Sequence, residues 1–312
     1  MKIKFFNVLL CSLVLIMLHT GVALSTETNL PPVQLTKITD NIYAYVGVPA
    51  GAPGDAFLAN VGVIIGDDGV LVVDTLTSAK EAKLLLANIR KVTDKPILYA
   101  VNTHYHLDHT MGNCIFAAQG AKIISHKNCR ESLLQTGAKT MAHPENFGLP
   151  KDFFAGTTIT APTITFDKEM QIDLGNMLIK LTYSGYASHS AGSVFVTVPE
   201  QSIVFTGDVL FTDFHPFLGE GDLNGWNTTL DQIEALHAKY IIPGHGPLSK
   251  AKDLADMQEY LKIFDEKAKK LSAKIQDPQK LAEEMIKVLP KRTNGDFIIG
   301  FNLQARYLKP AQ

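Results

Sequence analysis

Four potential metal ligands lie within six residues, in the segment His104-Tyr105-His106-Leu107-Asp108-His109. This segment directly follows the apolar run Ile97 to Val101, which predicts a buried strand. If the alternation of that strand persists to its end, His104 and His106 project to one side, where two imidazoles can bind one ion. Asp108 and His109 come where the chain should turn into a helix, and they can reach a second position. A single ion would leave some of these ligands unused, so we expect two metal positions at the end of this strand.

Three further residues of ligand type lie far downstream, each beside a predicted strand. His189 lies in a loop between two predicted strands, Asp208 follows a strand within Thr-Gly-Asp, and His245 follows a strand within Pro-Gly-His-Gly. Side chains at strand ends, on loops held by a rigid scaffold, are the usual place for a binding site. A surface histidine patch would not explain this set, which therefore indicates a metal centre.

The rest of the chain alternates between strand and helix patterns. Apolar runs bounded by turn signals predict strands near residues 42–46, 61–65, 70–73, 96–101, 122–125, 177–183, 193–198 and 202–205. Apolar residues at helical spacing predict helices at 79–91, 228–238 and 254–275. Strand, helix and strand follow one another as in a βαβ unit, and no repeat or low-complexity linker interrupts them. We expect sheets covered by helices in a single domain.

The N-terminus has the features of an export signal. Lys2 and Lys4 precede an apolar run from Phe5 to Leu18, and Ala23-Leu24-Ser25 offers a cleavage site between small residues. We expect residues 1–25 to be a signal peptide, with an uncleaved anchor as the alternative. Residues 26–312 would then form one domain, with a core at about 33–248 and a helical flank at about 252–312. The mature protein would be periplasmic or secreted, without a stable membrane span.

Composition excludes several classes of protein. The chain has 312 residues, of which 46% are hydrophobic and 19% charged, so it can bury a full core. Its formal net charge is −2, and loss of Lys2 and Lys4 makes it more negative, which gives no reason to expect a nucleic-acid partner. Cys114 and Cys129 remain after processing and are either a disulfide or two separate buried thiols. The sequence does not indicate an oligomeric state.

The ordered set of motifs resembles the metallo-β-lactamase superfamily over about residues 33–248. The resemblance implies an α/β fold, an αββα sandwich in which two mixed sheets pack face to face with helices outside. It also implies that His104, His106 and His189 bind a first metal, that Asp108, His109 and His245 bind a second, and that Asp208 bridges both. Asp74, which ends the strand 70–73, matches a family aspartate that supports the metal-binding loop from behind.

The chemistry of the ligands agrees with this assignment. Five imidazoles and two carboxylates suit two Zn²⁺ ions, and a carboxylate bridge also tolerates iron or manganese. A water between two dications loses a proton near neutral pH, because coordination can lower its pKa from about 16 to about 7. We therefore expect a metal-bridging hydroxide that cleaves an ester, thioester, lactone or lactam bond in a small molecule. Asp108 is a candidate proton shuttle.

Two departures from the family pattern bear on the substrate. Many zinc β-lactamases have a cysteine where this chain has Asp208, and a lysine where it has Phe211. Asp208 matches the bridging aspartate of glyoxalase II, but residues 254–312 show no clear basic motif that would bind glutathione. Hydrolysis of β-lactam antibiotics and an iron-dependent redox activity of the same fold remain alternatives, the second weakened by His109 and His245. A non-catalytic binding module is disfavoured because all seven ligands are present.

Specificity is expected in the loops around the site. The segments 48–57 and 136–161 are candidate walls of a substrate pocket. Phe211, Phe214, Phe217 and Trp226 follow the predicted bridging aspartate and either line an apolar pocket or pack in the core. No motif surrounds His126, His143, His215 or His237, and we assign them no role.

Overall fold

The computed structural model describes residues 33–47 and 57–308, and within these ranges the strands form two sheets. The seven-stranded sheet contains, in spatial order, β1 (Leu35–Lys37), β2 (Ile42–Tyr45), β3 (Val61–Ile65), β4 (Val70–Val73), β5 (Ile97–Val101), β6 (Lys122–His126) and β7 (Ile164–Phe166). The five-stranded sheet contains, in spatial order, β12 (Tyr240–Ile242), β11 (Ile203–Phe205), β10 (Val194–Val198), β9 (Leu178–Tyr183) and β8 (Glu169–Asp173). Both sheets are mixed, because β4 to β7 pair in parallel after an antiparallel start, and β11 pairs with β12 in parallel.

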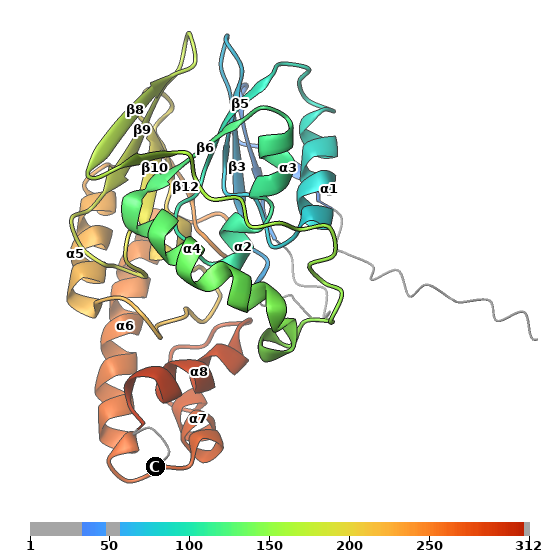
Figure 1. The fold of residues 1–312 in the computed structure, drawn as a ribbon. Helices are drawn as coiled ribbons and strands as arrows, with labels where there is room; N and C mark the ends of the chain where they lie inside the picture. Colours follow the sequence, from blue (N-terminus) through green and yellow to red (C-terminus); the bar gives the residue numbers. More distant parts are fainter. Residues whose placement is uncertain (1–32, 48–56, 309–312) are drawn as a thin grey trace, which may run out of the picture. The chain divides into compact units, whose positions relative to one another are not determined.

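The helices lie outside the two sheets. They are α1 (Ala79–Ile89), α2 (Leu107–Thr110), α3 (Asn113–Ala118), α4 (Lys127–Ala142), α5 (Leu223–Glu234), α6 (Ala251–Ser272), α7 (Pro278–Ile286) and α8 (Asp296–Arg306). Figure 1 shows α1 and α3 beside the first sheet and α5 and α6 beside the second. This is the αββα sandwich that the resemblance to the superfamily implies.

The strand β4 shows why the sheet is covered on both faces. All four of its residues are buried, and their side chains alternate between two cores. Val70 and Val72 pack with α1 in the outer core, whereas Leu71 and Val73 pack in the core between the sheets. A strand that is apolar on both faces can lie only in the interior of a layered fold.

The two sheets approach each other closely at Gly62 in β3. A Cβ atom at this position would lie 2.4 Å from the ring of Phe205 in β11. Phe205 belongs to the core between the sheets, which also contains Ile179, Leu181 and Val196 of the second sheet. The absence of a side chain at Gly62 thus gives the Phe205 ring its space.

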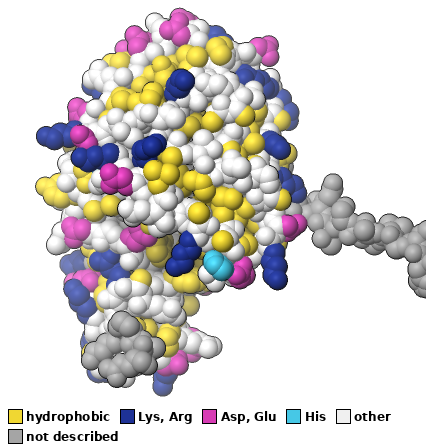
Figure 2. Space-filling model, viewed as in Figure 1, with side chains coloured by type: hydrophobic (Ala, Val, Ile, Leu, Met, Phe, Trp, Pro, Cys, Tyr) yellow, Lys and Arg dark blue, Asp and Glu magenta, His cyan; other side chains and the backbone are white. Residues whose placement is uncertain are grey.

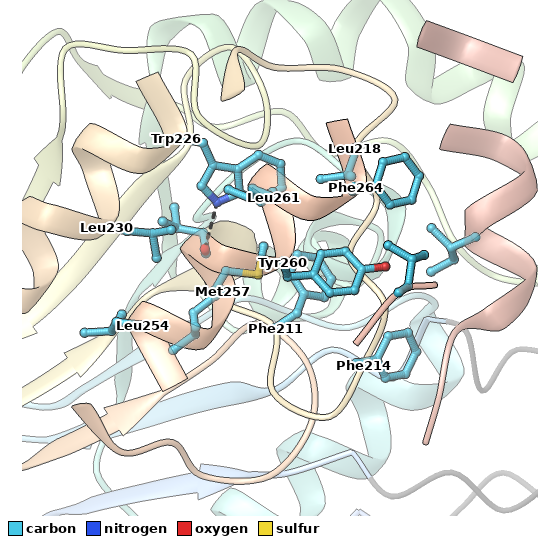
Figure 3. Close-up of a cluster of buried hydrophobic side chains, with 14 of the residues drawn as sticks. Phe211, Phe214, Leu218, Trp226, Leu230, Leu254, Met257, Tyr260, Leu261 and Phe264 are labelled. Carbon is cyan, nitrogen blue, oxygen red and sulfur yellow. Dashed lines mark hydrogen bonds between the residues drawn. The ribbon is translucent and has the colours of Figure 1, made fainter. Parts of the chain in front are cut away.

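A separate apolar core joins the second sheet to the C-terminal helices (Figure 3). Trp226 of α5 is fully buried there, and its indole Nε1 donates a hydrogen bond of 2.8 Å to the carbonyl of Val209. Tyr260 and Phe264 of α6 and Ile299 of α8 belong to the same cluster. The helical segment after residue 250 therefore shares its core with the sandwich.

The structure differs from the sequence-based expectations in its helices. α5 begins at Leu223 rather than at residue 228, because the Asp222 side chain caps it by accepting a hydrogen bond from the amide of Gly225. α4 was not predicted, since only Cys129, Leu133 and Gly137 of its sixteen residues are buried and the apolar periodicity is weak. The expected wall at 136–161 thus starts within a helix.

Cys114 and Cys129 are both free thiols. No helix within 33–47 and 57–308 is long and apolar enough to cross a membrane. The expected signal peptide at 1–25 and all of the 48–57 segment except Phe57 lie outside the described residues.

Asn60 ties the beginning of β3 to the loop that follows β12. Its side-chain amide donates hydrogen bonds of 2.8 Å to the carbonyls of Pro243 and Gly246, and its carbonyl oxygen accepts one from the amide of Gly47. Its own backbone amide donates to the carbonyl of Gly244. The loop around His245 is thereby held against the first sheet, although it belongs to the second.

Replacing Asn60 by alanine should lower the free energy of unfolding by about 3 kcal/mol, because buried polar groups in two loops lose their partners. Urea denaturation of the metal-free protein measures this change. Asn88→Ala is the control, since that partly exposed side chain bonds only the nearby Leu84 carbonyl and Lys91 ammonium and should change stability by less than about 0.5 kcal/mol. Equal stability of the two variants would show that Asn60 does not hold the loop.

Candidate metal centre

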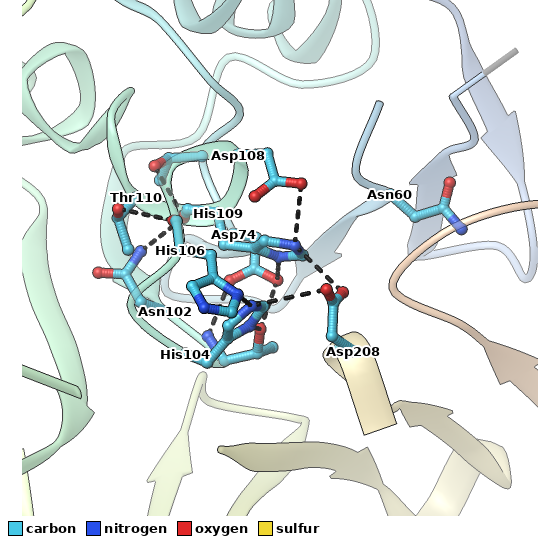
Figure 4. A network of polar contacts seen from close by, with 12 residues as sticks. Asn60, Asp74, Asn102, His104, His106, Asp108, His109, Thr110 and Asp208 are labelled. Atoms are coloured by element: carbon cyan, nitrogen blue, oxygen red, sulfur yellow. Dashed lines mark hydrogen bonds and ion pairs between the residues drawn. The ribbon is translucent and has the colours of Figure 1, made fainter. Parts of the chain in front are cut away.

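All seven predicted ligands lie at one edge of the sandwich, on segments that follow or join strands of both sheets. His104 and His106 follow β5, and α2 carries Asp108 and His109. His189 lies between β9 and β10, Asp208 lies just after β11, and His245 lies just after β12. Six of the seven residues are buried, and His106 is partly exposed. Figure 4 shows the side chains from the β5 end and Asp208 converging.

The ligand atoms form two adjoining groups. His104, His106, His189 and Asp208 form the first, and Asp108, His109 and His245 form the second. Within the first group, His106 Nδ1 lies 3.0 Å from His104 Nε2 and 2.9 Å from His189 Nε2. Within the second, Asp108 Oδ2 lies 3.2 Å from His245 Nε2 and 3.6 Å from His109 Nε2.

Asp208 faces both groups, with one carboxylate oxygen toward each. Its Oδ2 lies 3.6 Å from His104 Nε2 and 3.4 Å from His189 Nε2. Its Oδ1 lies 3.1 Å from His109 Nε2 and 3.4 Å from His245 Nε2. The carboxylate thus lies between the two groups, with one oxygen near the nitrogens of each.

These residues fit a pair of metal ions. Ligand atoms about 2.1 Å from a tetrahedral zinc ion are about 3.4 Å from one another, and the separations here run from 2.9 to 3.6 Å. His109 Nε2 and Asp208 Oδ1 are buried and have no hydrogen-bond partner. Buried polar atoms without a partner are costly, and a cation between them would satisfy both.

Asp74 supports the ligand segment from behind. Its Oδ2 lies 2.8 Å from His109 Nδ1, and its two oxygens accept hydrogen bonds of 2.8 Å from the amide and the hydroxyl of Thr103. Asp74 has a φ of 65°, a left-handed conformation that aspartate tolerates better than most residues. The bond to Nδ1 fixes the tautomer that leaves Nε2 of His109 as a lone-pair donor.

Two other imidazoles are oriented in the same way. His104 Nδ1 lies 3.1 Å from Thr103 Oγ1, and His189 Nδ1 lies 3.1 Å from the carbonyl oxygen of Phe217. Both contacts lie on the ring edge opposite the site. Each therefore favours the tautomer whose Nε2 points inward without a proton.

The two groups differ in their protonation. Burial lowers the pKa of His189 to about 3, and Asp208 opposes this only in part. Burial also lowers the pKa of His245, but the carboxylates of Asp208 and Asp108 outweigh it and raise that pKa to about 9. In the metal-free protein His189 is therefore neutral at neutral pH, while His245 carries a proton.

Glu220 and Tyr105 also belong to this region, although no sequence motif indicates them. Glu220 Oε1 accepts a short hydrogen bond from the Tyr105 hydroxyl and lies 3.6 Å from His106 Nε2. Burial raises the pKa of Glu220, but the contacts with His106 and Tyr105 outweigh it and lower the pKa to about 2. Glu220 lies in a glycine-containing loop far from His106 in sequence, so no local pattern marks it.

A cavity of about 550 Å³ opens onto the centre. His106, Asp108, Asp208 and His245 form its polar end. Of the four aromatic residues considered above, Phe211 and Phe217 line the cavity, whereas Phe214 and Trp226 pack in the core and do not line it. The 136–161 segment contributes Thr136, Gly137, Thr140, Asn146, Phe147 and Gly148 to the lining.

The chain is similar to one protein family and to several known proteins. A sequence profile of the Metallo-beta-lactamase superfamily matches residues 54–245. The "Metallo-beta-lactamase type 2" of Elizabethkingia meningoseptica is 26% identical in an alignment of 268 residues that covers 84% of this chain and 96% of that protein. Among solved structures, a metallo-beta-lactamase from Pontibacter korlensis has a TM-score of 0.56 at 20% identity, covering 73% of this chain and 98% of that one. The DIM-1 metallo-beta-lactamase has a TM-score of 0.57 at 22% identity, covering 74% and 98%.

Replacing Asp74 by asparagine should weaken zinc binding by about 10- to 100-fold. The neutral amide lacks the charged carboxylate oxygen that accepts a hydrogen bond from His109 Nδ1 and orients this imidazole. Competition with a chromophoric chelator measures the affinity. Asp94→Asn, an exposed change on the turn after α1, is the control and should bind zinc like the wild type. Unchanged affinity in Asp74→Asn would remove the supporting role.

Metal binding at pH 7 should release protons to the solvent. The raised pKa of His245, about 9, means that this imidazole is protonated before metal binds, and a ligand nitrogen must lose its proton. Apparent affinity should therefore rise as the pH rises toward 9 and fall as the solution is acidified. Calorimetric titration with zinc in two buffers of different ionisation enthalpy counts the protons, and identical heats in both would contradict the prediction.

Proposed function

Because the chain belongs to the metallo-β-lactamase superfamily and is a metal-dependent hydrolase, we propose that it is an exported di-zinc enzyme cleaving an ester, thioester, lactone or lactam bond in a small molecule. Under this proposal His104, His106 and His189 hold one ion, and Asp108, His109 and His245 hold the other. Asp208 bridges the two. Residues 1–25 act as the export signal of a single domain formed by residues 26–312.

The single observation that carries the proposal is the position of the Asp208 carboxylate. Its two oxygens lie 3.1 to 3.6 Å from ligand nitrogens of both groups. A carboxylate that bound a single ion would need only one of these two sets of neighbouring nitrogens. The second set, with its own aspartate, supports a two-metal site.

The donor atoms favour zinc. Imidazole nitrogen and carboxylate oxygen at tetrahedral separations suit Zn²⁺, whereas magnesium and calcium prefer oxygen ligands in larger number. Iron and manganese accept the same residues and are the metals to test beside zinc. When bound, the two ions would polarise a scissile carbonyl and lower the pKa of a water nucleophile from about 16 to about 7.

The protein's own side chains would position the substrate and move a proton. Burial raises the pKa of Asp108, but the imidazoles of His109 and His245 outweigh it and lower that pKa, so the carboxylate is ionised at neutral pH. Asp108 also lines the cavity, within reach of a bound substrate. An ionised carboxylate at this place can accept a proton and return it to the leaving group.

Hydrolysis of β-lactam antibiotics is the second candidate. It is favoured by the relative named "Metallo-beta-lactamase type 2", which matches 84% of this chain. β-Lactam antibiotics carry an ionised carboxylate, and none of the described residues lining the cavity is a lysine or arginine that would pair with it. We therefore rank this activity below cleavage of other carboxylic acid derivatives.

Elemental analysis of the purified protein, with hydrolysis assays on the same sample, tests the proposal. We expect two zinc ions per chain and turnover of at least one substrate among nitrocefin, a lactone, a thioester and an ester. Asp208→Ala should lose most of the metal and reduce turnover by at least 1,000-fold, because the ligand shared by both groups is gone. Asp94→Ala, at an exposed position, should retain both.

Other outcomes separate the alternatives. One iron per chain with no hydrolysis would move the protein to a redox function. Two zinc ions with nitrocefin as the only good substrate would make it a β-lactamase. Turnover that survives in Asp208→Ala would mean that the proposed centre is not the active site.

A further inference from the structure

Part of the cavity wall comes from a segment of the chain that the superfamily profile does not match. The profile ends at residue 245, whereas α8 contributes Phe297, Ile298 and Phe301 to the cavity lining. Phe297 and Phe301 are four residues apart, so both project from one face of the helix. The C-terminal helices thus add an apolar wall to the predicted active site.

These phenylalanines are unusually exposed for their size. Phe297 is 49% and Phe301 is 50% exposed, and their rings contact edge to face at 6.4 Å. Large apolar side chains that line a cavity yet stay open to solvent mark a surface that a ligand can cover. Figure 2 shows that hydrophobic side chains also gather across the middle of the viewed face, in the region of α4.

The part of the cavity lining that comes from Phe57 and Phe147 is apolar as well. Phe147, at the end of the short 3₁₀ helix Pro144–Phe147, packs edge to face against Phe57 at 6.0 Å, and both line the cavity. α4 contributes Thr136, Gly137 and Thr140, whose short side chains leave the space between the walls open. The cavity is therefore a slot between aromatic side chains that leads to the predicted metal centre.

At the inner end of the slot, apolar rings continue up to the ligands. The Phe217 ring lies 5.6 Å from the His106 ring, and Phe211 stacks on His245 with ring centroids 5.1 Å apart. Both phenylalanines line the cavity. An apolar arm bound in the slot would thus extend directly from a bond placed at the centre.

The one charged side chain that lines the described part of the slot without being a predicted ligand is Glu220. Its side chain is 40% exposed, and Arg306 of α8 binds the backbone carbonyls of Glu220 and Gly221, which fixes the loop that carries it. The Tyr105 hydroxyl donates to the same carboxylate. A fixed negative charge beside His106 repels an anionic group on a ligand.

We propose that the slot between α8 and the Phe57–Phe147 pair is a specificity site for an uncharged carboxylic ester, lactone or thioester bearing an extended apolar arm. This inference rests on the proposed hydrolytic function and narrows its substrate class. Phe297, Phe301 and Phe147 bind the arm, and Glu220 discriminates against substrates that carry a carboxylate.

Paired substrates test the proposal on the zinc-loaded full-length protein. The probes are p-nitrophenyl acetate, butanoate, hexanoate and octanoate, which share one scissile bond. Each buried methylene should raise kcat/KM about threefold to fourfold, mainly through a lower KM. The mono-p-nitrophenyl ester of glutaric acid, compared with the pentanoate, tests charge at similar length, and the neutral ester should be at least tenfold better.

Substitutions test which side chains cause the preference for long and uncharged substrates. In Phe301→Ala the octanoate-to-acetate ratio of kcat/KM should fall at least tenfold. Ile286→Ala is the matched control, because this residue of α7 is also exposed but does not line the cavity, and it should keep the wild-type ratio. In Glu220→Gln the preference for the pentanoate over the glutarate ester should fall at least fivefold.

Binding of the neutral fluorophore N-phenyl-1-naphthylamine gives a readout that does not depend on hydrolysis. The zinc-loaded protein should bind it, 1-octanol should displace it, and Phe301→Ala should weaken it at least fivefold while Ile286→Ala does not. Binding without hydrolysis of any ester would overturn the proposed function and leave the slot standing. Hydrolysis without chain-length dependence, together with no binding of the fluorophore, would overturn the slot and leave the hydrolase standing.

Discussion

The carboxylate of Asp208 can face two sets of imidazoles only if strands of both sheets end at the same edge. Asp208 and His245 follow the parallel strands β11 and β12, whereas His104 and His106 follow β5 in the other sheet. The face-to-face packing of the sheets, through side chains such as Leu71 and Val196, brings these ends together. The arrangement buries lone pairs that point at one another, which opposes folding unless a cation is bound. Burial of apolar side chains on both faces of β4 is one of the contributions that offset this cost in the metal-free chain.

Two of the predicted ligand segments are held by side chains from other parts of the chain. Asp74, at the end of β4, bonds His109 and Thr103 of the next strand connection. Asn60 of the first sheet bonds the carbonyls around His245 of the second. These hydrogen bonds hold the loops at the edge of the sandwich in a fixed geometry. A fixed geometry matters because a ligand side chain must be oriented before an ion can bind it strongly. The rigidity of the candidate site is therefore a property of the packed sheets more than of the loops.

Local sequence patterns predict the strands, several helices and the candidate ligands at strand ends, whereas the αββα sandwich and the grouping of the ligands are implied by the resemblance to the metallo-β-lactamase superfamily. β4 and β5 were predictable because short runs of β-branched residues between turn signals favour buried strands, and the ligands were found because each follows such a run. α4 was missed because few of its residues are buried. Glu220 and Phe301 escaped notice for a different reason. Their contacts join residues about a hundred or more positions apart, and no periodicity within a window records a partner at that distance.

The candidate metal ligands and the apolar wall of the cavity lie on different parts of the chain. The candidate ligands lie within the residues that the superfamily profile matches, on strand ends whose geometry the two sheets determine. The apolar wall lies on α8, beyond that match, and is held by the separate core around Tyr260 and Phe264. Arg306 of α8 in turn binds the backbone of the loop that carries Glu220, so one helix places both the apolar wall and the nearby negative charge. Under the proposals above, substitutions at the exposed Phe297 and Phe301 would change which substrate is accepted and leave the ligands in place, because these two side chains lie outside the buried cluster that joins α8 to Val209 and Phe211 beside Asp208.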